Sequence, residues 1–185
     1  MIGASVIRHS WTHFHALRAD RRGVALIEFA FTVPILLTMY IGSAELCNGI
    51  GAQRKVTTTT RALADLTSQY TVINNAELSQ IAAASAQIMA PYNVSVGYQL
   101  TITQVKIDGA SVAKVDWSYA QGTTPLTVGD NVTMDAALRQ PNTYMLVAQV
   151  QYIYTPRLGQ AFSKPITMRD TIFMSPRGSD FITRI

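Results

Sequence analysis

The sequence predicts an α+β protein in which an N-terminal transmembrane helix continues into a helical stalk, a packing helix and a roughly four-stranded antiparallel sheet. Three patterns predict this class. The chain is apolar from Val24 to Ile50, a helix-capping signal and a helical apolar repeat begin at Asn74, and apolar and polar residues alternate from Val94 onward. At 185 residues the chain is long enough for one such anchor and one domain with its own core.

The apolar segment has the length of a membrane span. Its strongly polar residues are Glu28, Glu45 and Asn48, and the stretch from Phe29 to Ala44 carries no charge. As helices, the whole segment and its uncharged core measure roughly 40 Å and 24 Å, which bracket a hydrocarbon thickness of about 30 Å. Arginines precede the segment, so the positive-inside rule places the N-terminus in the cytoplasm and residues beyond about 50 outside.

Other N-terminal signals compete with this interpretation. A secretory signal peptide cleaved after Gly42-Ser43-Ala44 would have an overlong apolar region interrupted by Glu28. A lipoprotein signal would need a small residue before Cys47, where Leu46 stands. A plain uncleaved anchor is the remaining alternative.

Charge and composition exclude several classes of function. Residues 1–23 carry +3 of the formal charge of +4, from Arg8, Arg18, Arg21 and Arg22 against Asp20. The rest of the chain is nearly neutral, so nucleic acid is not an expected partner. The single cysteine excludes Cys-pair redox and zinc sites, and all three histidines lie before Gly23. We therefore expect no enzyme activity, no cofactor and no metal site.

The expected organisation is a basic cytoplasmic leader at 1–23, a transmembrane helix at 24–50, a helical stalk at 51–73 and an α+β extracytoplasmic domain at 74–185. In the stalk, Val56, Leu63 and Tyr70 recur at seven residues with Leu66 between them. We favour a helix that covers its own domain over an intersubunit coiled seam. The β-branched run from Thr57 to Thr60 weakens the helical prediction locally.

The domain begins with a helix and continues as strands. Asn74 and Glu77 form a capping-box pattern that begins a helix, and Pro91 ends it. The predicted apolar face of this helix consists of Leu78, Ile81, Ala82, Ser85, Ile88 and Met89. The alternation that starts at Val94 slips near Thr103-Gln104, which predicts a β-bulge. The later elements are a turn at Asp108-Gly109, a returning strand through Val115, Trp117 and Tyr119, a long loop at 120–142 with a helical turn near 135–139, and strands at 143–154 and 166–174.

The junction between the leader and the apolar segment contains the most informative pair. Gly23 is followed five residues later by Glu28, a carboxylate inside an otherwise apolar helix. Such a charge needs a partner in the membrane. Cleavage after Gly23 would create an α-amine on Val24, with which the Glu28 carboxylate of a neighbouring subunit can pair. The spacing alone would occur by chance, so its weight comes from its position between basic and apolar residues.

Arg21-Arg22-Gly23, Glu28-Phe29-Ala30 and Pro34 together resemble the head of the TadE-like proteins of the tight-adherence (Tad, or Flp) pilus system. The resemblance implies a pilin-like α+β fold and cleavage by a prepilin peptidase. It assigns processing to Arg21, Arg22, Gly23, Val24 and Glu28, and subunit register to Val24, Glu28, Phe29 and Pro34. Phe29 stands where the best-known processed members have Tyr.

The same resemblance implies a minor pilin or pseudopilin needed for pilus assembly and surface adherence. Its expected partners are the prepilin peptidase, other pilins and pseudopilins, the inner-membrane assembly platform and the membrane itself. The protein would be a single-pass protein of the bacterial inner membrane with a periplasmic domain, before any entry into an extracellular pilus. Two alternatives remain: an uncleaved periplasmic scaffold of the same machinery, and an enzyme or ligand sensor on a tether.

Overall fold

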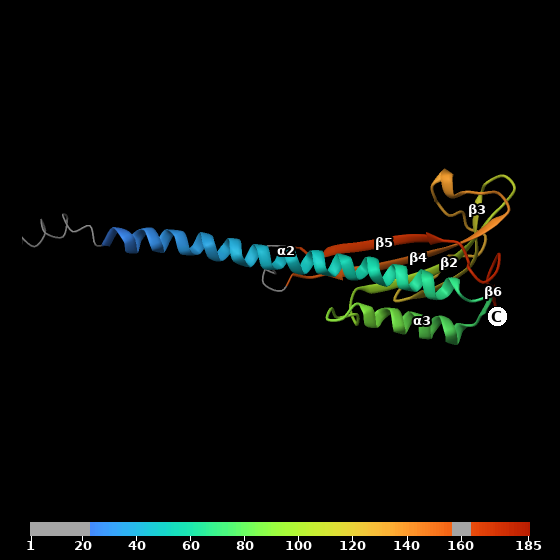
Figure 1. Ribbon diagram of the computed structural model, residues 1–185, viewed down its shortest axis with the longest axis horizontal. Coiled ribbons are helices and arrows are strands. Elements are labelled where there is room, and N and C mark those ends of the chain that lie inside the picture. The colour runs from blue at the N-terminus through green and yellow to red at the C-terminus, as the bar shows by residue number, and fades with distance from the viewer. Residues whose placement is uncertain (1–22, 157–163) are drawn as a thin grey trace, which may run out of the picture. The chain divides into compact units, whose positions relative to one another are not determined.

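The structure is a computed structural model that describes residues 23–156 and 164–185. Arg21, Arg22 and the three histidines therefore lie outside the described residues. The chain divides into two compact units, residues 1–44 and residues 45–185. The elements, most of which are labelled in Figure 1, are α2 (Val24–Ser68), β1 (Val72–Ile73), α3 (Asn75–Ile88), β2 (Tyr98–Ile107), β3 (Ala113–Gln121), the 3₁₀ turn η2 (Ala136–Leu138), β4 (Thr143–Tyr154), β5 (Ile166–Met174) and β6 (Thr183–Arg184).

The protein has the predicted α+β class, with a four-stranded antiparallel sheet in the order β3-β2-β4-β5. The bounds of β4 and β5 agree with those expected from the alternation of apolar residues. β2 begins at Tyr98 and not at Val94. The preceding segment turns instead, because the Asn93 side chain accepts a hydrogen bond from the Ser95 N–H and Gly97 has a φ of 72°.

The sequence did not reveal a second, two-stranded parallel sheet formed by β1 and β6. The N–H groups of Thr183 and Ile185 donate to the carbonyl groups of Thr71 and Ile73. Strands of two residues carry no periodic signal, and this pair joins segments more than a hundred residues apart. Its formation therefore depends on the tertiary structure.

α2 is one unbroken helix from Val24 to Ser68, so the β-branched run at Thr57 to Thr60 does not interrupt it. The hydroxyls of the buried Thr60 and Thr67 donate to the helical carbonyls of Val56 and Leu63, which satisfies them within the helix. From Ala52 onward the helix covers its own domain, through the buried residues Ala52, Val56, Thr59, Thr60, Leu63, Ala64, Thr67 and Ser68. Leu66, expected within this seam, is instead 38% exposed.

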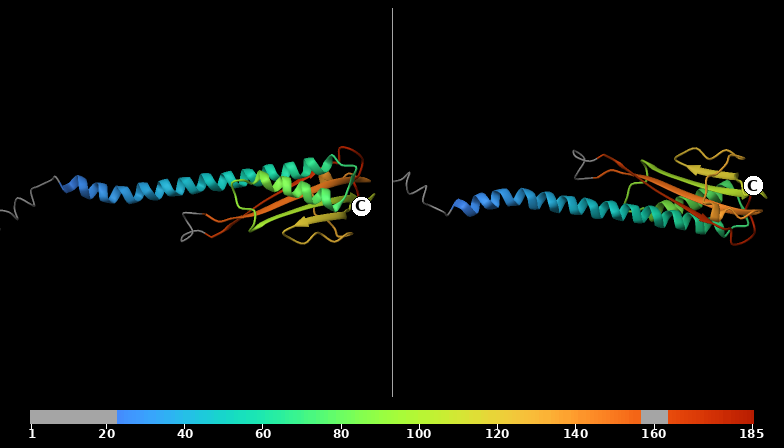
Figure 2. Two further views of the ribbon diagram at one scale, coloured as in Figure 1. Left: turned by 90° about the horizontal axis from the view of Figure 1, so that it is seen from below. Right: turned by 90° about the horizontal axis from the view of Figure 1, so that it is seen from above.

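The capping box at the start of α3 is confirmed. The Asn74 side chain accepts a hydrogen bond from the Glu77 N–H at 2.9 Å, and the Glu77 carboxylate accepts one from the Asn74 N–H at 2.8 Å. The apolar face of α3 packs into the main core with the buried face of α2. Figure 2 shows α3 and the last part of α2 on the same face of the four-stranded sheet.

The period slip near Thr103-Gln104 marks a change in the buried face of the sheet. Leu100 and Ile102 pack in the main core beneath the helices, whereas Val105 and Ile107 pack in a second core on the opposite face. The register between β2 and β4 is continuous, but the β2/β3 register shifts between Gln104 and Val105. The predicted bulge is thus present, and its extra residue, Asp116, lies on β3.

The long loop between β3 and β4 covers the second core. Met134 is buried there, and Val132 and Leu138 pack against it. The loop also hydrogen-bonds along β3, where the Val115 N–H donates to the Asp130 carbonyl and the Gly129 N–H donates to the Val115 carbonyl. The predicted helical turn is η2. The loop therefore both closes a core and pairs with one edge of the sheet.

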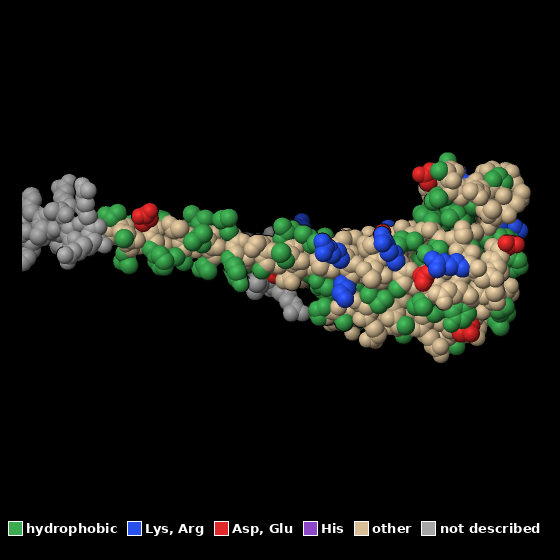
Figure 3. Space-filling model, viewed as in Figure 1, with side chains coloured by type: hydrophobic (Ala, Val, Ile, Leu, Met, Phe, Trp, Pro, Cys, Tyr) green, Lys and Arg blue, Asp and Glu red, His purple; other side chains and the backbone are tan. Residues whose placement is uncertain are grey.

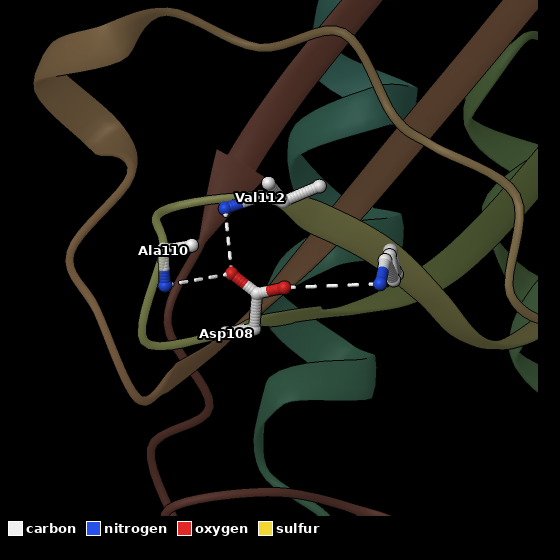
Figure 4. A network of polar contacts seen from close by, with 4 residues as sticks. Asp108, Ala110 and Val112 are labelled. Carbon is white, nitrogen blue, oxygen red and sulfur yellow. Dashed lines mark hydrogen bonds and ion pairs between the residues drawn. The ribbon is translucent and has the colours of Figure 1, made fainter.

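The predicted turn at Asp108-Gly109 joins β2 to β3. Figure 4 shows one carboxylate oxygen of Asp108 accepting hydrogen bonds from the N–H groups of Ala110 and Val112. The Lys114 ammonium nitrogen lies 3.7 Å from the other oxygen. The bond from Val112 is the main cause that lowers the pKa of Asp108 below its ordinary value. Within this network Ser111 has a φ of 61°, and the chain reverses its direction between β2 and β3.

Candidate functional site at the head of the apolar helix

Gly23 immediately precedes the first residue of α2. A Cβ atom built on Gly23 meets no atom within 4 Å, and its φ does not lie in the region that favours glycine. Neither packing against the described residues nor the backbone conformation thus requires glycine at this position. This observation separates Gly23 from Gly97 and Gly122, whose positive φ angles and close neighbours explain their lack of a side chain.

Val24 and Glu28 lie one helical turn apart at the start of α2. Residues spaced by four face the same side of a helix, so the nitrogen of Val24 and the Glu28 side chain share one face. Glu28 is exposed, and its carbonyl accepts a hydrogen bond from the Thr32 hydroxyl at 2.8 Å. Among the described residues, no ion pair engages the Glu28 carboxylate. The charge is therefore available to a partner outside this part of the chain.

Phe29 and Pro34, expected to set subunit register, both lie on α2. The ring of Phe29 is exposed, and Pro34 sits within the helix without ending it. Proline has no N–H to donate to the carbonyl of the residue four positions earlier. One turn later, the Thr38 hydroxyl donates to the Pro34 carbonyl at 2.8 Å. Thr32 and Thr38 thus add side-chain hydrogen bonds on both sides of the proline.

The first unit presents apolar side chains to its surroundings. The window of highest hydropathy in α2 is long and apolar enough to cross a membrane, and none of it is buried within the structure. Figure 3 shows hydrophobic side chains dominating the visible face of this segment, whereas Lys and Arg side chains lie over the domain. A free helix with apolar residues on all sides is suited to lipid or to other apolar helices.

The structure also identifies a second site, which the sequence analysis missed. Where α2 enters the domain, the Tyr154 hydroxyl donates to a carboxylate oxygen of Glu45 at 3.1 Å. The Tyr92 hydroxyl donates to the carbonyl of Asn48 at 2.9 Å. In the sequence, Glu45 and Asn48 mark the end of the uncharged core of the apolar segment. Nothing in the sequence, however, links Glu45 to a tyrosine more than a hundred residues later.

The described residues include no group of three His, Cys, Asp or Glu side chains close enough to hold a metal ion. The largest pKa shift among them belongs to Tyr98, whose pKa burial raises to about 12. Tyr98 lies in the main core beside the helices and not at the head of α2.

Comparison with known proteins bears on the helix that carries the candidate site. No curated protein and no solved structure matches the chain. Residues 23–65 match the family model described as TadE-like protein, as the resemblance of the head predicted. The match starts at Gly23, includes Val24, Glu28, Phe29 and Pro34, and ends within the part of α2 that packs on the domain. Over residues 23–65, this chain is therefore similar to the TadE-like family.

Proposed function

We propose that this protein is a minor pilin or pseudopilin of a bacterial tight-adherence pilus, processed after Gly23 and needed for pilus assembly and surface adherence. The observation that carries the proposal is the glycine at the first matched position. The family match begins at Gly23, yet nothing in the described structure requires glycine there. Recognition by a prepilin peptidase would supply a requirement for glycine at this position that the described structure does not.

Each head residue has a role in this proposal. Arg21 and Arg22 present the leader to the peptidase, which hydrolyses the bond between Gly23 and Val24. The new α-amine of Val24 then pairs with Glu28 of a neighbouring subunit. Breaking a buried ion pair by removing one partner costs about 3–5 kcal/mol, which is enough to decide subunit register. Phe29 and Pro34 shape the apolar surface on which the subunits pack.

The apolar half of α2 holds the protein in the inner membrane until assembly, with its domain in the periplasm. Its partners are the prepilin peptidase, other pilins and pseudopilins, and the inner-membrane assembly platform. The protein acts through assembly and not through catalysis, so it needs no cofactor and no metal.

Two glycine variants test the processing step. Gly23→Ala should block cleavage because the peptidase must accommodate this position, whereas Gly42→Ala should be cleaved normally. The two form a matched pair, since a Cβ at either glycine meets no atom within 4 Å. N-terminal sequencing and intact mass of protein from the native host should show a chain starting at Val24 in wild type and Gly42→Ala. A wild-type chain that retains residues 1–23 would instead support an uncleaved periplasmic scaffold.

Glu28→Ala tests the assembly step separately. This variant should still be processed but should be lost from sheared pilus fractions, because the missing charge affects pairing and not recognition. Glu45→Ala is the control, since Glu45 hydrogen-bonds within its own domain and should not be needed for subunit register. Loss of cleavage in Glu28→Ala, with normal assembly of the residual product, would contradict the assigned role.

A further inference from the structure

A groove of about 510 Å³ opens at the end of the domain where α2 enters it. We call it the tyrosine groove, and it is lined by Asn48, Pro91, Tyr92, Asn93, Val96, Gly97, Tyr152, Ile153, Tyr154 and Thr155. None of these lining residues is charged. Val96 is 75% exposed, and Ile153 is also exposed. The groove therefore combines aromatic rings and amides with an apolar rim.

The tyrosine groove is fixed to one turn of α2. Tyr154 donates to Glu45 and Tyr92 donates to the carbonyl of Asn48. The ring of Tyr92 packs against two other tyrosine rings, with centroid distances of 6.2 Å to Tyr152 and 6.3 Å to Tyr154. These contacts place the groove beside residues 45–48, within the second compact unit.

Chain connectivity sets the depth of this turn relative to a membrane. Glu45 directly follows Ala44, the last residue of the uncharged core, and Asn48 comes one helical turn later. Four residues of helix rise about 6 Å. The interfacial layer on each side of the hydrocarbon is about 5–8 Å thick. A hydrocarbon layer of about 30 Å centred on the uncharged core of roughly 24 Å extends about 3 Å past Ala44, so Asn48, about 6 Å past it, lies at the level of the lipid headgroups.

We propose that the tyrosine groove is a lipid-contact site, occupied by a phospholipid of the membrane that α2 spans. Tyrosine suits this position because its ring is apolar and its hydroxyl is polar, and it is enriched at membrane interfaces. The contact holds the base of the domain against the bilayer before assembly.

This inference rests on the apolar segment spanning a membrane, and not on cleavage or on entry into a pilus. The two proposals can therefore fail separately. Failure of the glycine and Glu28 tests would leave the tyrosine groove at the headgroup level. Conversely, a processed pilin whose groove does not contact lipid would overturn only this inference.

Depth-dependent quenching tests the proposal in the full chain. In a Cys47→Ser background, single cysteines replace Val96 at the groove or Val128 in the β3–β4 loop, and each carries an environment-sensitive fluorophore. The positions are matched because both are exposed valines outside regular structure, at 75% and 67%. In nanodiscs of phosphatidylcholine and phosphatidylglycerol, spin-labelled lipid should quench the Val96 label several-fold more strongly than the Val128 label. Equal quenching of the two labels would overturn the proposal.

A second measurement uses the unmodified protein, so that an effect of labelling on the fold cannot decide the outcome. A phospholipid with a photoactivatable group near its glycerol should form adducts with residues 91–97 or 152–155 in the same nanodiscs. Adducts confined to the apolar half of α2 would contradict the assignment. Chain-to-chain crosslinks through residues 91–97 would show that a second copy occupies the groove and would overturn it as well.

Discussion

Replacing Gln104 with methionine should release the C-terminal segment from the domain. Gln104 is fully buried, and its side-chain amide acts as a substitute for a peptide group. Its oxygen accepts from the Ile182 N–H at 2.7 Å, and its nitrogen donates to the Ile182 carbonyl at 3.1 Å and to a carboxylate oxygen of Asp116 at 2.7 Å. The Trp117 side-chain N–H also donates to the Ile182 carbonyl, at 2.9 Å.

The magnitude follows from which groups lose their partners. In Gln104→Met, the Ile182 carbonyl keeps its bond from Trp117, whereas the buried Ile182 N–H has no acceptor. A buried unpaired N–H costs about 1–3 kcal/mol. The charge-assisted bond to Asp116 is also lost, although water can partly replace it because Asp116 is only half-buried. Methionine recovers some apolar transfer energy, so the expected loss in the free energy of unfolding is about 2–4 kcal/mol.

Urea unfolding of the compact unit from Glu45 to Ile185 measures this loss. Trp117 is the only tryptophan in this fragment, so its emission reports directly on the contact with Ile182. Hydrogen exchange at Thr183 and Ile185, which donate to the β1 region, should accelerate in the variant. Gln149→Met is the control, because this half-buried glutamine lies on β4 away from the C-terminal segment. A Gln104→Met change below about 1 kcal/mol, with unaltered exchange, would refute the reasoning.

Two further predictions concern the main core. Leu63→Ala should cost about 2–5 kcal/mol in the free energy of unfolding because Leu63 is fully buried, whereas Leu66→Ala should cost under about 1 kcal/mol. Equal effects in urea titrations would mean that α2 packs through a different face. Burial raises the pKa of Tyr98 to about 12, so its stabilising contribution is complete below pH 10 and is lost as the pH rises toward 12, by about 1–2 kcal/mol. Tyr98→Phe should lack this loss and be no less stable at pH 7, because the buried Tyr98 hydroxyl has no hydrogen-bond partner among the described residues. An identical alkaline loss in both proteins would exclude Tyr98 as its source.

The head of α2 was accessible to sequence reasoning because its features are local. Glu28 within an apolar run, Pro34 and the basic-to-apolar boundary are all visible within a few turns of one helix. The sequence could not show that Gly23 is free of packing constraints, since that depends on which atoms surround its α-carbon. The weight of the spacing still comes from its position between basic and apolar residues and from the family match that begins at Gly23.

The tyrosine groove and the Gln104 contact escaped prediction for a common reason. Each joins segments that are distant in the chain, as with Tyr154 and Glu45 or Gln104 and Ile182. A glutamine inside an alternating strand looks like a solvent-facing residue, and only its burial beside Ile182 shows that its amide is satisfied. The expected seam on α2 was partly wrong for the same reason, because a repeat of seven fits several faces and the sheet beneath selects one.

The sequence by itself determined where this protein is apolar, where α3 begins and where β4 and β5 lie, because caps and periodicities are interactions between neighbours in the chain. It also placed the candidate processing site. The tertiary structure decided which face of α2 is buried, why the alternation in β2 slips, and how the C-terminal segment and the tyrosines meet their partners. These outcomes depend on burial and on hydrogen bonds between segments that are distant in the chain, and such contacts form only when the chain folds.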